Sequence, residues 1–436
     1  MADDKVVSLG SRLKAASSIL LARSRLGNLA GVTYEGDRDL YKYLGYKRTL
    51  SFDDYNQRYL RGGIAGRIVD AYPQATWRAV PSIFELGTQE EDTKGPFVKD
   101  FNNLARRLRL FHYFERADKL AGIGKYSILL IGVRGAGSLE RSMPPLTSSE
   151  DVLFLAPFSE NNAQVKEYET DPANSRFGLP KIYQIKLARD LNGGGRSVVN
   201  EQLVHYTRVL HISEGLLEDE IFGLPRLHRV WNYLDDLDKI VGGSAEAVWR
   251  TVDRGIQFDI DKDLDLDPDD ETDMVDEIEE YVHNFKRYIK TRGVTARVLG
   301  SDSVDSSSPF TSTMSLIAGS AGIPQRILLG SESGQSASAS DERNFASRVK
   351  ERQQSFAEPI MIRTFIERLE QHGALAVPDE GYYVKWPDVN TLTAREKADV
   401  AARVAQAAKN ISTQTKDSKE AMDPVDFRKR YLDEGN

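Results

Sequence analysis

Cysteine is absent from this chain of 436 residues. Its absence excludes disulfide bonds, thiolate metal sites and a cysteine nucleophile, and it is compatible with a reducing compartment. Long apolar runs are also missing: the longest, YSILLIGV from Tyr126, has the length of a strand, so no transmembrane span is expected. The N-terminal sequence MADDKVVSLG has acids where a secretory signal needs basic residues, and no export signal is expected.

Positive charge is in deficit. The chain has 58 Lys and Arg against 66 Asp and Glu, a formal net charge of −8. Because affinity for nucleic acid comes mainly from basic residues that displace phosphate counterions, this balance argues against tight wrapping of nucleic acid. It is compatible with a surface that DNA passes without being held. The length predicts about three domains, or two with an elongated extension.

Motifs of nucleotide and metal chemistry are incomplete. GIGKYS has Tyr126 at the Ser/Thr position of a phosphate-binding loop, and GVRGAGS lacks the third glycine of a dinucleotide motif. A calcium loop starting at Asp261 would need Gly and Glu where the chain has Leu266 and Thr272. The six histidines show no metal-binding spacing. No metal and no cofactor are therefore expected.

One enzymatic alternative stays open in HYTRVLHIS. His205-x-Thr207 and His211-x-Ser213 resemble the paired motifs of two-histidine phosphodiesterases, in which imidazoles act as general acid and base on one phosphate. On a straight strand the rings would lie ~20 Å apart, at about 3.3 Å per residue. On a helix they would point about 240° apart. Only a chain that folds back between them could bring both to one phosphate.

From Tyr34 to about Ser213 the sequence predicts a body of the α+β class. Helical spacing covers DYNQRYLRGGIAGRIVDAY and FVKDFNNLARRLRLFHYFERADKLAG, with Leu104, Leu108 and Phe111 on one face of the latter. Strand-like runs follow in YSILLIGV, DVLFLAPF, PKIYQIKLA and RVLHIS, and the Asn-Gly of DLNGGGRSVV predicts a hairpin. The residues before 34 are basic and weakly amphipathic; a docking arm and a frayed terminus both stay open.

A long helix is predicted from Pro225, because proline suits the first turn of a helix. Its apolar residues recur at spacings of three and four, and Gly242-Gly243 is a candidate bend. GIQFDI and TARVLG predict strands on either side of an acidic run and the helical MVDEIEEYVHNFKRYIK. FTSTMSLIAGSAGIP predicts a returning helix, so that two helices bracket a small insertion.

The stretch SESGQSASAS, which follows Gly330, has almost nothing to bury and predicts a flexible loop. Ser338 and Asp341 resemble a capping box at the start of the next helix, which Pro359 should kink. GYYVKWP predicts a short strand, and Thr393 with Glu396 predicts the start of a C-terminal helix.

The order of these elements resembles that of the portal proteins of tailed bacteriophages, from about Tyr34 to Asn436. The most specific segment is AGIPQRILLGSESGQSASASDERNFASRVKERQQSFAEPIM, with an Ile-Pro, a Leu-x-Gly end, a Ser/Gly-rich loop and a helix carrying Gln and Pro. YLRGGIAGRIVDAYPQATWR and WPDVNTLTAREKADVAARVAQA are similar to early and late segments of that family.

The resemblance implies an α+β portal fold with an α/β wing, a long-helix stem, a small ββα-type clip insertion and an α-helical crown. It divides the chain into an N-terminal arm (1–33), wing (34–222), stem helix (223–251), clip (252–305), second stem helix (306–330), tunnel loop (331–341), long kinked helix with the base of wing and crown (342–388), and crown (389–436).

The resemblance also implies three groups of site residues. The tunnel loop facing DNA comprises Ser331, Glu332, Ser333, Gly334, Gln335, Ser336, Ala337, Ser338, Ala339 and Ser340. The clip that docks an adaptor carries Asp261, Asp263, Asp265, Asp267, Asp269 and Asp270, and the stem packs through Leu227, Val230, Trp231 and Leu234. Small uncharged side chains in the loop would neither hold phosphates nor obstruct DNA; a plain solvated linker is the alternative.

The implied function is a homo-oligomeric ring of about twelve subunits at one capsid vertex of the virion, assembled in the host cytoplasm. Double-stranded DNA would be packaged and ejected through its channel. Implied partners are terminase, a head–tail adaptor, and the major capsid and scaffolding proteins, with no membrane and no catalytic residue. The alternatives are a two-histidine phosphodiesterase and a non-ring connector or scaffold-binding module.

Overall fold

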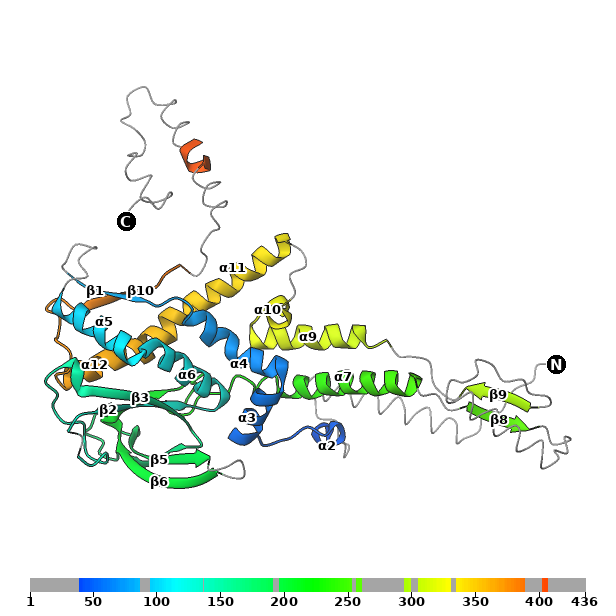
Figure 1. The fold of residues 1–436 in the computed structure, drawn as a ribbon, viewed down its shortest axis with the longest axis horizontal. Coiled ribbons are helices and arrows are strands. Elements are labelled where there is room, and N and C mark those ends of the chain that lie inside the picture. Colours follow the sequence, from blue (N-terminus) through cyan, green and yellow to red (C-terminus); the bar gives the residue numbers. More distant parts are fainter. Residues whose placement is uncertain are drawn as a thin grey trace. The chain divides into compact units, whose positions relative to one another are not determined.

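The computed structural model describes residues 39–86, 95–135, 137–190, 196–252, 256–260, 294–298, 305–330, 335–388 and 402–406 (Figure 1). The chain divides into two compact units. The larger unit combines Leu50–His228 with Ala321–Asn436, and the smaller combines Met1–Thr49 with Arg229–Ser320. Each unit therefore joins segments that lie far apart in the sequence.

The helices of the larger unit begin with α3 (Phe52–Arg61), α4 (Gly63–Thr76), α5 (Pro96–Leu108) and α6 (Leu110–Ile123), of which α5 and α6 pack against the sheets (Figure 1). The helical segment expected around Leu104, Leu108 and Phe111 is in fact broken between α5 and α6. Arg109 ends α5 with a φ of 52°, in the left-handed region. Leu104 and Leu108 still share one hydrophobic core with Phe111, which packs against it from the second helix.

The central sheet has the antiparallel order β3-β2-β7, built from β2 (Ser127–Val133), β3 (Val152–Ser159) and β7 (Val209–Ile212). Every residue of β2 is buried. Leu129 and Ile131 belong to the core that the helices share, and Ile128 and Leu130 belong to a second core. Because side chains alternate along a strand, burial on both faces explains the continuous apolar run YSILLIGV.

The second core lies against an antiparallel sheet of order β4-β5-β6. It comprises β4 (Ala163–Tyr168), β5 (Pro180–Asp190) and β6 (Arg196–His205). The pairing of β5 with β6 runs from Ile182↔His205 to Asp190↔Arg196 and confirms the predicted hairpin. Strand β4 was not predicted, since its sequence AQVKEY is largely polar and its residues after Ala163 are mostly exposed.

A second unpredicted strand, β1 (Ser82–Glu85), pairs antiparallel with β10 (Tyr382–Lys385). The pairing confirms the strand expected in GYYVKWP and brings the C-terminal part of the larger unit beside its N-terminal part. Phe84 and Tyr383 stack across it, with ring centres 5.2 Å apart.

Helix α11 (Gln335–Arg352), the π-helical segment η3 (Gln353–Arg363) and α12 (Thr364–Gln371) follow one another without a break. The expected loop boundary is therefore wrong: residues 335–340 form the first turns of α11, and Ser338 is not its N-cap. Alanine and glutamine favour a helix, and adding residues to an existing long helix is easier than nucleating one. Pro359 lies within η3, so the irregularity expected at the proline takes the form of π-helical turns.

Gly330 ends the short helix α10 (Gln325–Leu329) with a φ of 68°, which agrees with the predicted end of the apolar run. Residues 331–334 lie outside the described residues. So do the acidic run, the segment MVDEIEEYVHNFKRYIK, and Thr393 with Glu396; residues 402–406, within the expected C-terminal helix, are helical.

The smaller unit contains α2 (Leu40–Leu44), α7 (Trp231–Val252), β8 (Ile256–Ile260), β9 (Val294–Val298) and most of α9 (Ser307–Ala321). The expected start at Pro225 is wrong, because residues 226–230 form turns and α7 begins at Trp231. Gly242 and Gly243 lie inside the helix. Strands β8 and β9 pair antiparallel, which confirms the two strands expected within the insertion, on either side of the acidic run and the segment after it.

Candidate functional site: a buried charge network at the base of the long helix

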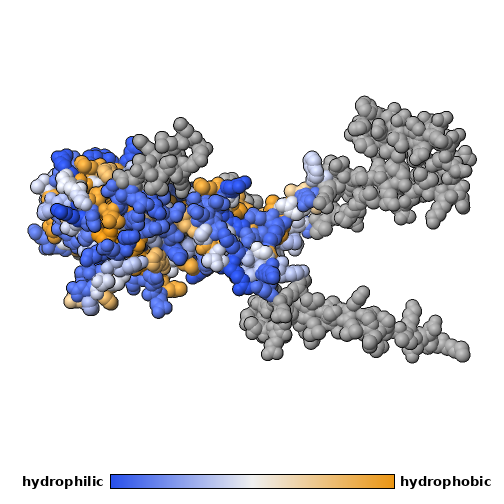
Figure 2. All heavy atoms as spheres, turned by 90° about the horizontal axis from the view of Figure 1, so that it is seen from below, coloured by the Kyte–Doolittle hydropathy of each residue, from blue (hydrophilic) through white to orange (hydrophobic). Residues whose placement is uncertain are grey.

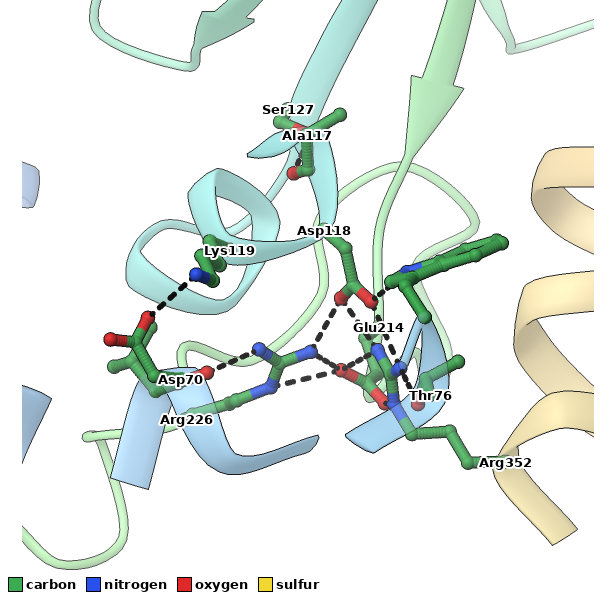
Figure 3. A network of polar contacts seen from close by, with 11 residues as sticks. Asp70, Thr76, Ala117, Asp118, Lys119, Ser127, Glu214, Arg226 and Arg352 are labelled. Carbon is green, nitrogen blue, oxygen red and sulfur yellow. Dashed lines mark hydrogen bonds and ion pairs between the residues drawn. The ribbon is translucent and has the colours of Figure 1, made fainter. Parts of the chain in front are cut away.

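Arg352, the last residue of α11, is 7% exposed and joins the long helix to the body of the larger unit (Figure 3). Its Nε donates to Glu214 Oε1 at 2.7 Å, and its Nη2 donates to Asp118 Oδ1 at 2.6 Å and Glu214 Oε2 at 3.1 Å. Its Nη1 donates to Asp118 Oδ2 and to Thr76 Oγ1, both at 2.9 Å. The guanidinium thus binds two carboxylates, each through two bonds.

A second guanidinium, that of Arg226, lies on the other side of the same carboxylates (Figure 3). Its Nη2 donates to Asp118 Oδ1 at 2.7 Å and to Glu214 Oε2 at 2.5 Å, and its Nη1 donates to Val69 O at 2.9 Å. Trp77 Nε1 completes the shell of Asp118 at 3.0 Å. Two positive and two negative groups therefore balance one another, as the buried Asp118 and Arg352 require, while Glu214 and Arg226 are partly buried.

The network is held in its ionised form. Burial alone would raise the pKa of Glu214, but the charges of Arg226 and Arg352, with their hydrogen bonds, outweigh burial and hold that pKa far below its ordinary value. Burial likewise disfavours the charged form of Arg352, yet Asp118 and Glu214 hold the pKa of Arg352 above its ordinary value. The ion pairs accordingly persist throughout the neutral range.

Each member of the network comes from a different segment. Asp118 lies on α6, Glu214 follows β7, Arg226 lies in the turns after Pro225, and Arg352 closes α11. Gly122, one turn after Asp118 on α6, provides the space, because a Cβ there would collide with Arg226 Nη1. The network fixes the end of α11 against three other parts of the larger unit.

A hollow of ≈650 Å³ opens beside the network, between residues 213–216 and the junction of α11 with η3. Arg348 and Tyr72, which also line it, both donate to Gly322 O, at 3.1 and 2.9 Å. Its lining contains no histidine, and its partly buried carboxylate, Glu214, is engaged by two arginines. The arrangement is suited to holding a helix in place rather than to acid–base chemistry.

The histidine pair does not form an acid–base site. The chain turns at η2 (Tyr206–Arg208) between the two residues. His211 Nε2 donates to Ile221 O at 2.9 Å, so its Nδ1 accepts from the Tyr183 hydroxyl at 3.1 Å. Burial lowers the pKa of His211 to about 4, which keeps it neutral. Since both its nitrogens are engaged, the phosphodiesterase alternative is not favoured.

The predicted site residues lie elsewhere. The stem residues are buried: Leu227 and Val230 precede α7, and Trp231 and Leu234 lie in its first turn. The tunnel residues Gln335, Ser336, Ala337, Ser338, Ala339 and Ser340 open α11, while Ser331, Glu332, Ser333 and Gly334 lie outside the described residues. So do the clip residues Asp261, Asp263, Asp265, Asp267, Asp269 and Asp270.

No member of the charge network was predicted from the sequence. The available signal is that Arg352 stands three residues after Val349 and four before Phe356, on the apolar stripe of a long helix. A charge on a buried stripe indicates a buried partner. In the part of the chain that the structure describes, no group of His, Asp and Glu could hold a metal ion. Nor does any described helix combine the length and hydrophobicity needed to cross a membrane.

Comparison with known proteins relates the whole body of the chain to one family. A family model described as phage portal protein matches residues 53–410. Similar solved structures include a chain of "Neck of empty GTA particle computed with C6 symmetry", 16% identical with a TM-score of 0.52, covering 81% of this chain and 90% of that one. Another is a chain of "Virion of native gene transfer agent (GTA) particle", 14% identical with a TM-score of 0.50, covering 91% and 96%. An HK97-family phage portal protein from Corynebacterium diphtheriae is 11% identical with a TM-score of 0.38, covering 78% and 97%. No curated protein matches the sequence.

Proposed function

Because this chain belongs to the phage portal protein family, we propose that it forms a ring at one capsid vertex through which DNA is packaged and ejected. The observation that carries the proposal is the family match over residues 53–410, which includes nearly all of the described chain. The similar chain from the GTA neck belongs to an assembly computed with C6 symmetry, which supports a ring. We expect about twelve subunits in a virion, assembled in the host cytoplasm.

Helix α7 supports contacts between copies of the chain. Leu234 and Leu237 in its first half are buried, but Val241, Val248 and Trp249 in its second half are 51%, 62% and 73% exposed. These three positions lie on one side of the helix, since they are seven and eight residues apart. Figure 2 likewise shows several separate hydrophobic patches on one face of the described chain. In the proposed ring, α7 of a neighbouring subunit covers this stripe.

We assign the parts of the proposed portal fold to the observed helices and strands. The body of α3 to α6 with its two main sheets is the wing, α7 and α9 are stem helices, β8 and β9 belong to the clip, and residues 389–436 form the crown. Terminase supplies the ATP hydrolysis that drives packaging. The acidic residues Asp261 to Asp270 dock a basic surface of a head–tail adaptor, so this binding weakens with added salt.

We keep residues 331–340 as the proposed DNA-facing segment, although its structure differs from the loop expected from the sequence. Its second half is the beginning of α11 rather than a loop, and residues 333–340 carry no charge. A wall of Ser, Gly, Ala and Gln offers no cation to hold phosphates as DNA moves past. Through α11, the Arg352 network fixes the position of this segment relative to the wing.

Electron microscopy and mass determination on the purified protein, alone and coexpressed with capsid and scaffolding proteins, test the ring. We expect rings with a central hole. A uniform monomer under both conditions would refute the ring, and a monomer bound to capsid protein would establish the non-ring connector instead.

The DNA-facing segment is tested separately in a packaging assay. Ser336→Arg with Ser338→Arg should leave the rings intact but slow or block packaging, because two arginines per subunit would hold phosphates. The matched control replaces the same serines by alanine and should package normally. Packaging that is unchanged by the arginines would refute this assignment while leaving the ring untouched.

A further inference from the structure

Basic side chains from separate elements gather around Tyr206 in the larger unit, away from the Arg352 network. Tyr206 lies in η2, between β6 and β7. The cluster comprises Arg176 from the turns before β5, Lys181 of β5, His205 at the end of β6, Arg208 of η2, Arg368 of α12, and His372 after α12.

The geometry draws these charges close together. The guanidinium carbon of Arg176 lies 3.8 Å from the centre of the Tyr206 ring, and that of Arg368 lies 5.5 Å from it. The two guanidinium groups are therefore no more than about 9 Å apart, the sum of these distances. The His205 ring centre lies 4.5 Å from the same ring. One aromatic side chain thus brings three cationic or protonatable groups together.

Few carboxylates offset this charge. Lys181 forms an ion pair with Glu169 at 3.2 Å, and Glu367 precedes Arg368 on α12 with an exposed side chain. In the described part of the chain, neither Arg176 nor Arg368 forms an ion pair. Arg208 is buried, and its guanidinium donates to the carbonyls of Arg141 and Ser142. The cluster carries an excess of positive charge.

The titration behaviour of its members agrees with this excess. Burial lowers the pKa of His205, and the charges of Lys181, Arg208, Arg368 and Arg176 lower it further. Burial lowers the pKa of His372, and Arg368 and Arg208 add to the effect. The pKa of Arg368 is lowered by burial and then by Arg176. The basic neighbours thus disfavour the charged form of each of these groups.

Both guanidinium groups beside Tyr206 have further hydrogen-bond donors. A guanidinium has five N–H groups. Within the described residues, Arg176 uses one of them on Pro180 O at 3.0 Å, and Arg368 uses one on Tyr206 O at 2.6 Å. Both arginines are partly exposed, so an ion from solvent can reach them. Planar arrays of N–H donors match the oxygens of phosphate groups, which they bind through paired hydrogen bonds.

We propose that Arg176 and Arg368 form a binding site for a phosphate-type oxyanion beside Tyr206, with His205 at its edge. The anion offsets the mutual repulsion of the cluster and accepts from the unused N–H groups. The site binds and does not catalyse, since His211, the partner that an acid–base mechanism would need, is engaged through both ring nitrogens. Free phosphate and the backbone of nucleic acid supply the same chemistry. The proposal concerns the larger unit alone and does not depend on the ring.

Calorimetric titration of the full-length protein with inorganic phosphate, in chloride buffer at constant ionic strength, tests the site. We expect saturable binding that Arg176→Gln and Arg368→Gln each weaken by at least about tenfold, the effect of losing a charged hydrogen bond. Arg78→Gln, a change at an exposed arginine outside the cluster, should leave binding unaltered. Should Arg368→Gln fail to fold, Arg176→Gln still tests the site, because Arg176 lies in a turn before β5.

Absence of saturable phosphate binding overturns the proposal, as does equal binding by wild-type protein and Arg176→Gln. A short DNA duplex distinguishes the two sources of phosphate. A duplex that displaces inorganic phosphate, and binds more weakly to Arg176→Gln, identifies the nucleic-acid backbone as the ligand. A duplex that leaves phosphate bound identifies the free ion.

Discussion

Replacing Arg352 with methionine should destabilise the larger unit strongly. Within the described residues, Arg352 donates to Glu214, Asp118 and Thr76 through its Nε and both Nη groups. Methionine fills similar volume but leaves the buried Asp118 and the partly buried Glu214 with Arg226 as their one guanidinium partner, a net charge of −1. Breaking a buried ion pair on one side costs about 3–5 kcal/mol. Domains are typically stable by about 5–15 kcal/mol, so the change removes a large share of the stability.

A double-mutant cycle tests whether unpaired charge is the cause. Adding Glu214→Gln to Arg352→Met removes the surplus carboxylate and leaves Asp118 paired with Arg226. We therefore expect the double variant to be more stable than Arg352→Met alone, although Glu214→Gln by itself destabilises. Lys350→Met, an exposed change two residues away on α11, should alter stability by less than about 0.5 kcal/mol.

Urea denaturation followed by tryptophan fluorescence measures the wild-type protein and all four variants, and Trp77 reports locally because its indole donates to Asp118. A loss below about 1 kcal/mol for Arg352→Met would refute the reasoning, since it would fall within the range of a single neutral hydrogen bond. Strictly additive losses in the cycle would also refute it, because additivity means that the two groups do not interact.

Three further predictions concern other parts of the chain. His211 has a pKa of about 4 when folded and about 6.5 when unfolded, so the unfolded state takes up the proton first as pH falls. The free energy of unfolding should drop by up to about 3 kcal/mol between pH 6.5 and 4. In urea titrations at several pH values, His211→Gln should lose this dependence of the unfolding free energy on pH. A pH dependence equal to that of the wild type would contradict the assignment. Gly122→Ala should lower the melting temperature, because the added Cβ would meet Arg226 Nη1. Gly319→Ala in α9 should raise the melting temperature, because the space around Gly319 is open and alanine favours a helix. Shifts of the same sign for the two variants would be inconsistent with this packing. Val248→Asp should abolish rings in mass measurements while leaving the chain folded, since the side chain is 62% exposed; intact rings would show that α7 packs otherwise.

Local patterns predicted most elements correctly where one short-range cause dominates. The run from Tyr126 is apolar at nearly every position because β2 is buried on both faces, and its short length favours a strand. The Asn-Gly pair predicted the β5–β6 hairpin, and Gly330 marked the end of the apolar run that closes with α10. The predicted boundaries of helices were wrong where the residues have only weak preferences for helix or loop. Ser338 and its neighbours join α11 because a long helix continues into them, which local composition does not reveal.

The portal resemblance also came from the sequence, from the order of its elements and from the segment around Ile323 and Pro324. The family match over residues 53–410 confirms it. The roles of the individual site residues do not follow from that match. Residues 335–340, for instance, were assigned to the channel as a loop and prove helical, so their role there stays a prediction.

By itself, then, the sequence determined the α+β class, most strands and helices, and the family. Tertiary structure alone decided which charges meet. Arg352 and Asp118 are 234 residues apart, and Arg176 and Arg368 come from a turn and a helix that share no local pattern. A periodic pattern records whether a position faces the core, and so it can show that Arg352 lies on a buried stripe. It cannot name the carboxylate that neutralises it, because an ion pair depends on the distance between atoms and not on their separation along the chain.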